Sequence, residues 1–246
     1  RDAADPGDIN KTGYFGSERD GGFAEYTTIP ARNALVVNSP LTDAELATFS
    51  CSYSTAEGML TRAAVMADDT LLIPGASGGV GGALVQLAKR RGARVIAMAA
   101  EAKHDAVATL GPDRILPRTP EDLGTALADE TITVLADVVG GPAWPHLIET
   151  LARGGRYVCS GAIAGPMVTL DLRTFFLRDL TFHGSTVIAP EVMENLIGYI
   201  ERGEVQPALA ATFPLADLHA AQAAFISKTH TGNIVVVPKA HTGRSS

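Results

Sequence analysis

The sequence contains few of the features that define several large classes of protein. Only two of its 246 residues are cysteines, Cys51 and Cys159, which is too few for a disulfide framework and is typical of a reducing compartment. It has no run of about eighteen apolar residues that could span a bilayer, and no basic and apolar leader of the secretory type opens it. We therefore expect a cytoplasmic protein that does not interact with membranes.

Positive charge is also scarce. The formal net charge is −7, and basic residues concentrate only at Lys89, Arg90, Arg91 and Arg94, on the polar side of an expected helix. A nucleic-acid-binding surface needs a larger basic patch than this, so we expect no nucleic-acid partner. The apolar content of 46% with 19% charged residues is that of an ordinary globular protein with a large core.

Apolar residues follow an alternating pattern along the middle of the chain. Short β-branched runs are separated by longer segments in which apolar residues recur at helical spacing, as at Val80, Leu84 and Leu87. This alternation indicates βαβ units and an α/β fold with a doubly wound parallel sheet. The expected strands cover residues 70–73, 94–98, 133–138, 156–160 and 180–185.

The pattern changes at both ends of the chain. Residues 22–38 are expected to be extended. The last part is expected to form helices over 190–202 and 216–227 and a strand over 234–237. Both ends are therefore predicted to belong to a second domain that flanks the sheet domain.

Glycine is concentrated in the segment GASGGVG at residues 75–81, which has two interpretations. Ala76, Gly78 and Gly81 fit the A-x-G-x-x-G form of the dinucleotide fingerprint, in which a diphosphate rests against the first amides of a helix. The same segment also fits the G-x-S-x-G elbow of a hydrolase, with Ser77 at its centre.

The hydrolase interpretation needs Ser77 as a nucleophile, with Asp137 and His230 later in the chain as its acid and base. No H-G-G-G-type loop precedes the serine to form an oxyanion hole. A second strand follows the glycines after about twenty residues, as the dinucleotide fingerprint requires, and we favour that interpretation. A tight turn without a ligand is the third alternative.

Four motifs, in this order, resemble the medium-chain dehydrogenase/reductase family of zinc-type alcohol dehydrogenases and quinone oxidoreductases. They are GGFAEY at 21–26, CSYSTAEGML at 51–60, GASGGVG at 75–81 and HTGNIVVVP at 230–238. The resemblance implies a Rossmann domain over 39–189, with a partial β-rich, GroES-like catalytic domain over 1–38 and a return to it over 190–246. Most of the front of the catalytic domain is expected to be missing.

The resemblance also implies an activity. Relatives transfer hydride between a nicotinamide coenzyme and a small-molecule substrate, here expected to be an alcohol, carbonyl, enone or quinone. The alternative is a nucleotide-binding sensor or structural relative without turnover. In relatives, the strand near Leu180 to Val187 pairs with its twin, so a homodimer is expected.

Three residues carry catalytic or metal hypotheses. Cys51 corresponds to the third zinc ligand of the zinc-dependent branch; the other two ligands would lie in the missing segment, so a zinc site would be incomplete here. Thr55 corresponds to the threonine beside the nicotinamide, although Ser54 and Glu57 also predict a capping box at that point. Tyr53 is a candidate proton donor, with packing as its alternative.

The coenzyme is expected to be NADP(H) rather than NAD(H). Ala99 and Ala100 end the second strand where an acidic side chain would repel a 2′-phosphate, and Lys103 could pair with that phosphate, although Glu101 lies nearby. Asn233 stands where the family often has lysine. The small residues after two other strands could bind the coenzyme or form turns. The implied coenzyme-binding residues are Thr55, Ala76, Ser77, Gly78, Gly79, Val80, Gly81, Ala99, Lys103, Val138, Val139, Gly140, Ser160, Gly161, Ala162 and Asn233.

Overall fold

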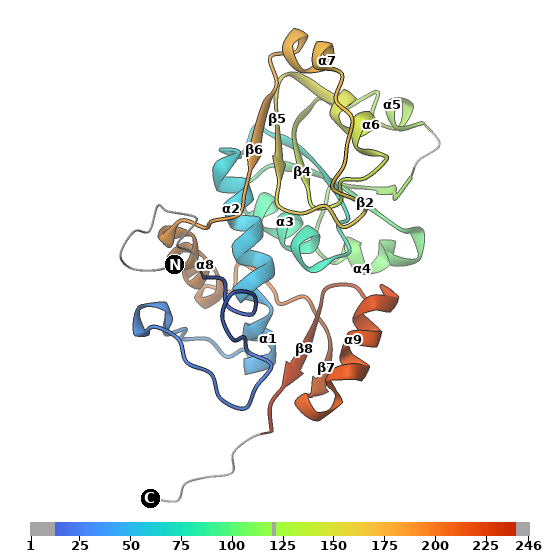
Figure 1. Ribbon diagram of the computed structural model, residues 1–246. Helices are drawn as coiled ribbons and strands as arrows, with labels where there is room; N and C mark the ends of the chain where they lie inside the picture. Colours follow the sequence, from blue (N-terminus) through green and yellow to red (C-terminus); the bar gives the residue numbers. More distant parts are fainter. Residues whose placement is uncertain (1–12, 120–121, 240–246) are drawn as a thin grey trace, which may run out of the picture.

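A six-stranded parallel sheet forms the centre of the protein. The computed structural model describes residues 13–119 and 122–239, and its sheet has the strand order β3-β2-β1-β4-β5-β6 (Figure 1). This order reverses direction beside β1, as in doubly wound nucleotide-binding sheets. The predicted α/β fold is therefore confirmed. The strands are β1 Thr70–Pro74, β2 Arg94–Ala99, β3 Arg114–Pro117, β4 Ile132–Asp137, β5 Leu151–Cys159 and β6 Thr181–Gly184.

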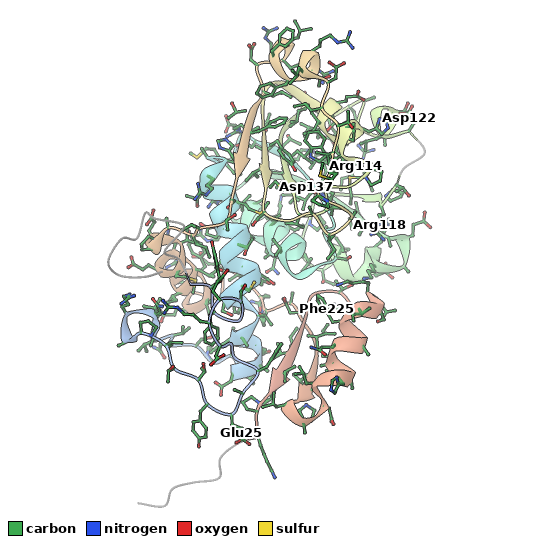
Figure 2. All side chains as sticks on the ribbon, in the orientation of Figure 1. Glu25, Arg114, Arg118, Asp122, Asp137 and Phe225 are labelled. Atoms are coloured by element: carbon green, nitrogen blue, oxygen red, sulfur yellow. The ribbon has the colours of Figure 1, made fainter. Side chains whose placement is uncertain are left out.

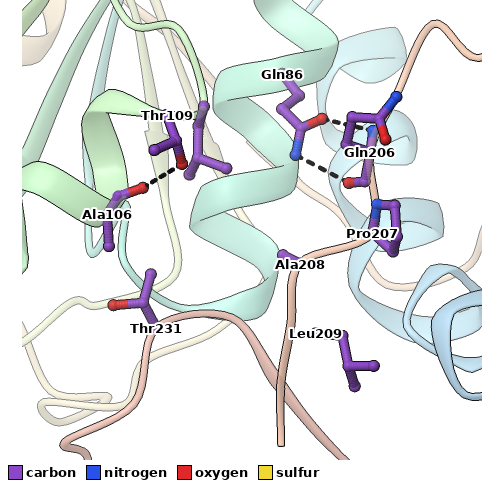
Figure 3. Close-up of a pocket in the computed structure, with 9 residues that line it drawn as sticks. Gln86, Ala106, Thr109, Gln206, Pro207, Ala208, Leu209 and Thr231 are labelled. Carbon is purple, nitrogen blue, oxygen red and sulfur yellow. Dashed lines mark hydrogen bonds between the residues drawn. The ribbon is translucent and has the colours of Figure 1, made fainter.

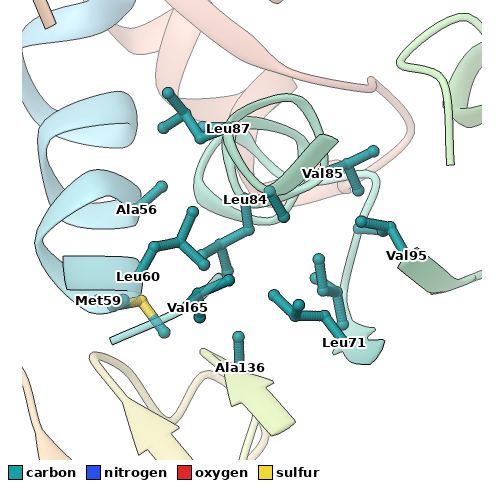
Figure 4. Packing of buried hydrophobic residues seen from close by; sticks show 14 of the residues in the cluster. Ala56, Met59, Leu60, Val65, Leu71, Leu84, Val85, Leu87, Val95 and Ala136 are labelled. Carbon is teal, nitrogen blue, oxygen red and sulfur yellow. The ribbon is translucent and has the colours of Figure 1, made fainter. Parts of the chain in front are cut away.

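Helices cover both faces of this sheet. Leu71 of β1 belongs to a cluster with α2 (Ser54–Arg62) and α3 (Gly79–Arg90), whereas its neighbour Leu72 belongs to a cluster with α6 (Trp144–Glu149). Successive strand residues point to opposite faces, so a strand buried on both sides is apolar throughout. Figure 4 shows residues of the first cluster, with Leu60 of α2 beside Leu84 of α3.

The remaining helices of the sheet domain are short. They lie in the connections between strands. The 3-10 turn η4 Glu101–Lys103 leads into α4 His104–Ala108 after β2, α5 Leu123–Ala126 follows β3, and α7 Leu172–Leu177 precedes β6.

A helical run leads into the sheet domain and contains an irregular turn. It consists of α1 Asp43–Ala47, a π-helical segment η3 Phe49–Tyr53, and α2. The capping box predicted at Ser54 and Glu57 is wrong, because Ser54 continues the run and its Oγ donates to the Ser50 carbonyl at 2.7 Å. The capping box lies one helix earlier, where Thr42 and Glu45 bond each other reciprocally.

The C-terminal part forms a second, smaller unit, drawn below the large sheet in Figure 1. Parallel strands β7 Leu209–Pro214 and β8 Asn233–Val237 pair, with η5 Leu215–Asp217 and α9 Leu218–Ser227 between them, while α8 Pro190–Glu201 packs against α2. The late helices and last strand were predicted; β7 was not.

The N-terminal part differs from the prediction. Between residues 13 and 38 the structure has one isolated bridge, Phe15 with Arg19, and one 3-10 turn, η2 Ala31–Asn33. The extended segment expected over 22–38 pairs with no strand. A β-rich remnant of a catalytic domain is therefore not shown by the described residues.

The basic residues near the end of α3 are engaged in ion pairs. Four carboxylates from different parts of the chain bind them, which joins α3 and β2 to their surroundings. The pairs are Lys89 with Asp113, Arg90 with Glu204, Arg91 with Glu57, and Arg94 with Glu130. Across the described ranges 13–119 and 122–239, no helix is both long and apolar enough to cross a membrane.

Candidate functional site

The N-terminus of α3 lies at the end of β1, where the glycine-rich segment turns. Gly75 adopts the left-handed region at φ +69°, and Gly78 is the N-cap residue of α3. No side chain caps this helix, so its first amides have no side-chain acceptor. Unpaired amides and the helix dipole together attract an anion.

Gly81 and Gly78 differ in how closely other atoms approach them. A Cβ on Gly81 would lie 2.2 Å from the Gly75 carbonyl oxygen, so the contact between helix and strand requires glycine there. A Cβ on Gly78 would meet only that same oxygen, at 3.5 Å, and the Gly78 φ of −82° suits any residue. Nothing within the described chain demands glycine at position 78. A ligand that lies against the Gly78 backbone would require glycine there, because a side chain would occupy the same space. The site therefore fits a dinucleotide diphosphate.

Two segments that are distant in the sequence lie at the N-terminus of α3. Gly232 pairs with Gly78, and its amide donates to the Ser77 carbonyl at 2.9 Å. Ser52 of the π-helical segment and Asn233 of β8 lie against Gly79, where a Cβ would stand 2.5 Å from the Ser52 Oγ and 2.4 Å from the Asn233 Oδ1. The structure therefore brings Asn233 to the predicted site and adds Ser52, which the sequence had not indicated.

The predicted loops after β4 and β5 lie side by side. The amides of Ile163 and Ala164 donate to the carbonyls of Val138 and Val139 at 3.3 and 2.8 Å. A Cβ on Gly140 would lie 2.8 Å from the Gly165 carbonyl oxygen. The small residues at Gly140, Gly161 and Ala162 thus allow two loops to approach each other, which accounts for them without a ligand.

Asp137 organises these loops and was not predicted to do so. Asp137, which is labelled in Figure 2, is fully buried at the end of β4. Its Oδ1 accepts from the amides of Val139 at 2.7 Å and Gly140 at 3.2 Å. Its Oδ2 accepts from the Tyr157 hydroxyl at 3.1 Å. Burial raises the pKa of Tyr157, and the charge of Asp137 adds to the rise. The signal in the sequence was an aspartate that ends a buried strand, followed after two valines by Gly140 and Gly141.

Lys103 does not stand free at the end of β2. Its Nζ donates to the carbonyls of Lys228 and His230, each at 2.6 Å, and so fastens the segment after α9 to the sheet domain. Burial lowers the pKa of Lys103, and the nearby charges of Arg118 and Lys228 lower it further. The ammonium expected to meet a 2′-phosphate therefore already binds two carbonyls.

Arg118 offers positive charge in the same place. Pro117 is paired with Ala99 across β3 and β2, so Arg118 directly follows the partner of Ala99 (Figure 2). Arg118 is exposed, and no ion pair joins it to another residue within 13–119 or 122–239. Arg118 was not among the predicted residues, because β3 was not predicted.

The environment of Tyr53 does not suit a proton donor. Its side chain is fully buried, its hydroxyl donates to the Gln206 carbonyl, and Gln86 Nε2 donates to that hydroxyl at 2.9 Å. Burial raises the pKa of Tyr53 to about 12. Thr55 differs, because it is the one residue from Ser52 to Leu60 that is not buried.

Zinc does not fit the residues present. Cys51 is exposed, and no group of three or more His, Cys, Asp or Glu side chains that could hold a metal lies in the described part of the chain. A catalytic zinc needs three protein ligands. The chain as described therefore offers no complete zinc site.

The hydrolase interpretation is not supported either. Asp137 is bound to loop amides and to Tyr157, and the His230 ring lies beside Phe225 with its centroid 5.7 Å away. No hydrogen bond between side chains joins Ser77, His230 and Asp137. Burial and the neighbouring lysines lower the pKa of His230.

A groove of about 410 Å³ lies between α3, α4 and the segment before β7 (Figure 3). Gln86 and Gln206 bond reciprocally at its edge, with the Gln206 amide donating to Gln86 Oε1 at 2.8 Å. None of the residues predicted to bind the coenzyme lines it. The lining residues are Gln86, Ala106, Thr109, Leu110, Gln206, Pro207, Ala208, Leu209 and Thr231.

A family model described as zinc-binding dehydrogenase matches residues 79–202, just over half of the chain. The match begins at the first residue of α3 and runs past α8. The chain belongs to the zinc-binding dehydrogenase family. Membership confirms the resemblance to medium-chain, zinc-type dehydrogenases, and it is compatible with the lack of a complete zinc site in the described residues.

Proteins described as dehydrogenases or reductases resemble the chain over nearly its whole length. A solved structure from Sinorhizobium meliloti, described as a candidate alcohol dehydrogenase, is 45% identical, covers 92% of this chain and 64% of its own, and has a TM-score of 0.89. Acryloyl-coenzyme A reductase of Metallosphaera sedula is 25% identical over 90% of this chain and 67% of its own length. NADPH-dependent alkenal/one oxidoreductase of Arabidopsis thaliana is 27% identical over 94% of this chain and 56% of its own. The chain thus spans about two thirds or less of these relatives.

Proposed function

We propose that this chain binds a nicotinamide coenzyme and acts in hydride transfer to or from a small alcohol, carbonyl, enone or quinone. The observation that carries the proposal is the uncapped start of α3 at Gly78, where a glycine stands that the chain's own packing does not require. Family membership supports NAD(P)-dependent redox chemistry. When bound, the coenzyme would donate or accept the hydride, and the chain would bind and orient the coenzyme.

Each part of the coenzyme has a matching set of residues in this proposal. The amides of Gly79, Val80 and Gly81 would receive the diphosphate, because they begin α3 without a side-chain cap. The adjacent loops after β4 and β5, held by Asp137, would line the adenosine and nicotinamide halves. Thr55 would face the nicotinamide, since its neighbours on α2 are buried and it is not.

We further propose that the preferred coenzyme is NADP(H). β2 ends in Ala99, and Ala100 follows it, so neither position carries the carboxylate that would repel a 2′-phosphate; the nearest acidic side chain is Glu101, the next residue along the chain. Arg118 takes the role first expected of Lys103, because its guanidinium is exposed beside the end of β2 while the Lys103 ammonium binds carbonyls. A guanidinium binds phosphate with two parallel hydrogen bonds. The name of the Arabidopsis relative also refers to NADPH.

A titration tests the proposal directly. Nicotinamide fluorescence is followed as protein is added to NADPH or to NADH, and quinones, enones and aldehydes are then added in turn. Binding with a lower Kd for NADPH, followed by oxidation with at least one acceptor, is the expected result. Binding without oxidation by any acceptor supports the sensor without turnover, and no binding of either coenzyme contradicts both functions.

A further inference from the structure

Ser52 and Asn233 form a hydrogen-bonded pair across 181 positions of the sequence. The Ser52 Oγ donates to the Asn233 Oδ1 at 2.6 Å. Ser52 is buried in the π-helical segment, and Asn233 is the first residue of β8. Both side chains lie against the α-carbon side of Gly79, where any Cβ would overlap them. The pair therefore sits directly on the first residue of α3.

Three further contacts fix the same corner. The Asn233 amide and its Nδ2 both donate to the Ala208 carbonyl, at 2.7 and 3.3 Å. The amide of the preceding residue, Gly232, donates to the Ser77 carbonyl, and its lack of a Cβ allows a close approach to Ala208, whose carbonyl oxygen would lie 2.3 Å from a Cβ at position 232. The start of β8 is thus hydrogen-bonded both to the segment before β7 and to the turn before α3.

The pair connects the two ends of the proposed coenzyme site. Ser52 lies one turn before Thr55 in the helical run, and Gly79 is the first residue at the uncapped N-terminus. Ser52 lies within the π-helical segment that leads directly into α2, and Thr55 is the second residue of α2. A displacement of the pair would move Thr55 relative to the amides of α3.

We propose that Ser52 and Asn233 are positioning residues that hold the diphosphate-binding end of α3 in register with the helix that carries Thr55. This inference rests on the proposed function, because it concerns the same coenzyme site. Neither side chain is charged. The Ser52 hydroxyl donates its hydrogen bond to Asn233, and the side-chain amide of Asn233 is bonded to Ser52 and to Ala208. They contribute to coenzyme affinity by holding the start of α3 in place. Their loss should therefore weaken the binding only of ligands that contact the start of α3.

A double-mutant cycle tests the pair. Ser52→Ala, Asn233→Ala and the double variant are titrated with NADPH, and with adenosine 2′-monophosphate, which has the adenosine and its 2′-phosphate but no diphosphate. Each single variant is expected to raise the Kd for NADPH about 5- to 10-fold, with the larger effect for Asn233→Ala because it also removes the Nδ2 bond to Ala208. The double variant should bind little more weakly than Asn233→Ala alone, because both single variants remove the hydrogen bond between Ser52 and Asn233. The Kd for adenosine 2′-monophosphate is expected to stay within about 2-fold of the unaltered protein.

Two further variants complete the experiment, one as a control and one as a replacement for Asn233→Ala. Ser50→Ala is the matched control, because the Ser50 Oγ bonds only to the Ala47 carbonyl in the same helical run, and it should leave both Kd values unchanged. Asn233→Asp keeps the size of the side chain and serves if Asn233→Ala does not fold. Its carboxylate can still accept from Ser52, but it places a negative charge near the diphosphate, so NADPH binding should weaken more than about 10-fold.

The outcomes separate cleanly. Additive losses, equal losses for both ligands, or no loss in any variant would each overturn the positioning role while leaving coenzyme binding intact. If the unaltered protein binds neither NADPH nor NADH, the proposed function itself fails, and the inference fails with it.

Discussion

Gly81 lies against Gly75 so closely that the helix and the strand end are in direct backbone contact. A Cβ on Gly81 would stand 2.2 Å from the Gly75 carbonyl oxygen and 2.8 Å from the Ala76 Cα. Backbone cannot move away from such an overlap as a flexible side chain can. The last glycine of the fingerprint is therefore a packing residue, whereas Gly78, three positions earlier, has room for a side chain.

This difference predicts opposite results for two alanine substitutions. Gly81→Ala should lower the free energy of unfolding by about 1–3 kcal/mol, as overpacking does. Gly78→Ala should change it by less than about 0.5 kcal/mol, because its Cβ meets only one atom at 3.5 Å. Gly78→Ala should nevertheless raise the Kd for NADPH at least about 10-fold, since the methyl group would occupy the diphosphate position. Urea unfolding and nicotinamide fluorescence measure the two quantities. Normal NADPH binding by Gly78→Ala would contradict the proposed site.

Arg118 and Lys103 should differ in their effect on coenzyme preference. Arg118→Gln removes the proposed 2′-phosphate contact and is expected to weaken NADPH binding about 10-fold while leaving NADH binding within about 2-fold, as loss of one charged hydrogen-bonding partner does. Lys103→Met removes a tether to Lys228 and His230, so it should weaken both coenzymes to the same degree. Fluorescence titrations with both coenzymes give the ratio of Kd values. A loss of NADPH selectivity in Lys103→Met alone would restore the original assignment of Lys103.

Asp137 should be needed for the loops at the ends of β4 and β5. It is a fully buried carboxylate that accepts from two loop amides and from Tyr157. Asp137→Asn would turn part of that group into a donor facing N–H groups, and we expect a loss of about 2–3 kcal/mol in the free energy of unfolding. Tyr157→Phe removes a single bond and should cost about 1 kcal/mol. Urea unfolding ranks the two variants; equal stability of Asp137→Asn and the unaltered protein would show that the loops are held by other contacts.

The sequence predicted those elements whose burial leaves a local pattern. β1 and β2 are apolar at consecutive positions because helices cover both faces, so they were found. β3 was missed because its four residues, Arg114–Pro117, include a charge and end in proline. β7 was missed as well: its burial alternates, but two alanines and a threonine make up half of its six residues, so the contrast between its apolar and polar positions is low.

The candidate site was predictable only where the backbone defines it. The GASGGVG segment lies at the strand-to-helix turn, as the fingerprint requires. The role of Lys103 was not predictable, because its partners are carbonyls 125 and 127 positions away, and carbonyls leave no mark in a sequence. Ser52 was missed for the same reason, since only the folded chain places Asn233 beside it.

High pH should reveal the buried phenol of Tyr53. Burial raises its pKa from 10.0 to about 12, so the folded state favours the neutral form. The contribution of the neutral Tyr53 hydroxyl to the free energy of unfolding is fully present below pH 10 and is lost as the pH rises from 10 through 12. Tyr53→Phe removes its bonds to Gln86 and Gln206, which should cost about 1 kcal/mol at pH 8. Urea unfolding at increasing pH should show this difference shrinking above pH 10; a constant difference would mean that the Tyr53 hydroxyl is not desolvated.

The outer edge of β6 is proposed as the contact in a homodimer. β6 ends the sheet order, so no strand within residues 13–119 and 122–239 pairs with its outer side. α7 leads into β6, and exposed apolar side chains lie in and before this helix, at Met167, Leu172, Phe176 and Leu177. An unpaired edge beside apolar side chains favours association with a second copy. Phe176→Glu should therefore shift the protein from dimer to monomer in sedimentation velocity. Ile226→Glu is the matched control, because Ile226 is also exposed but lies on α9, far along the chain from this edge. A monomer in the unaltered protein, or dimers that survive Phe176→Glu, would rule out this interface.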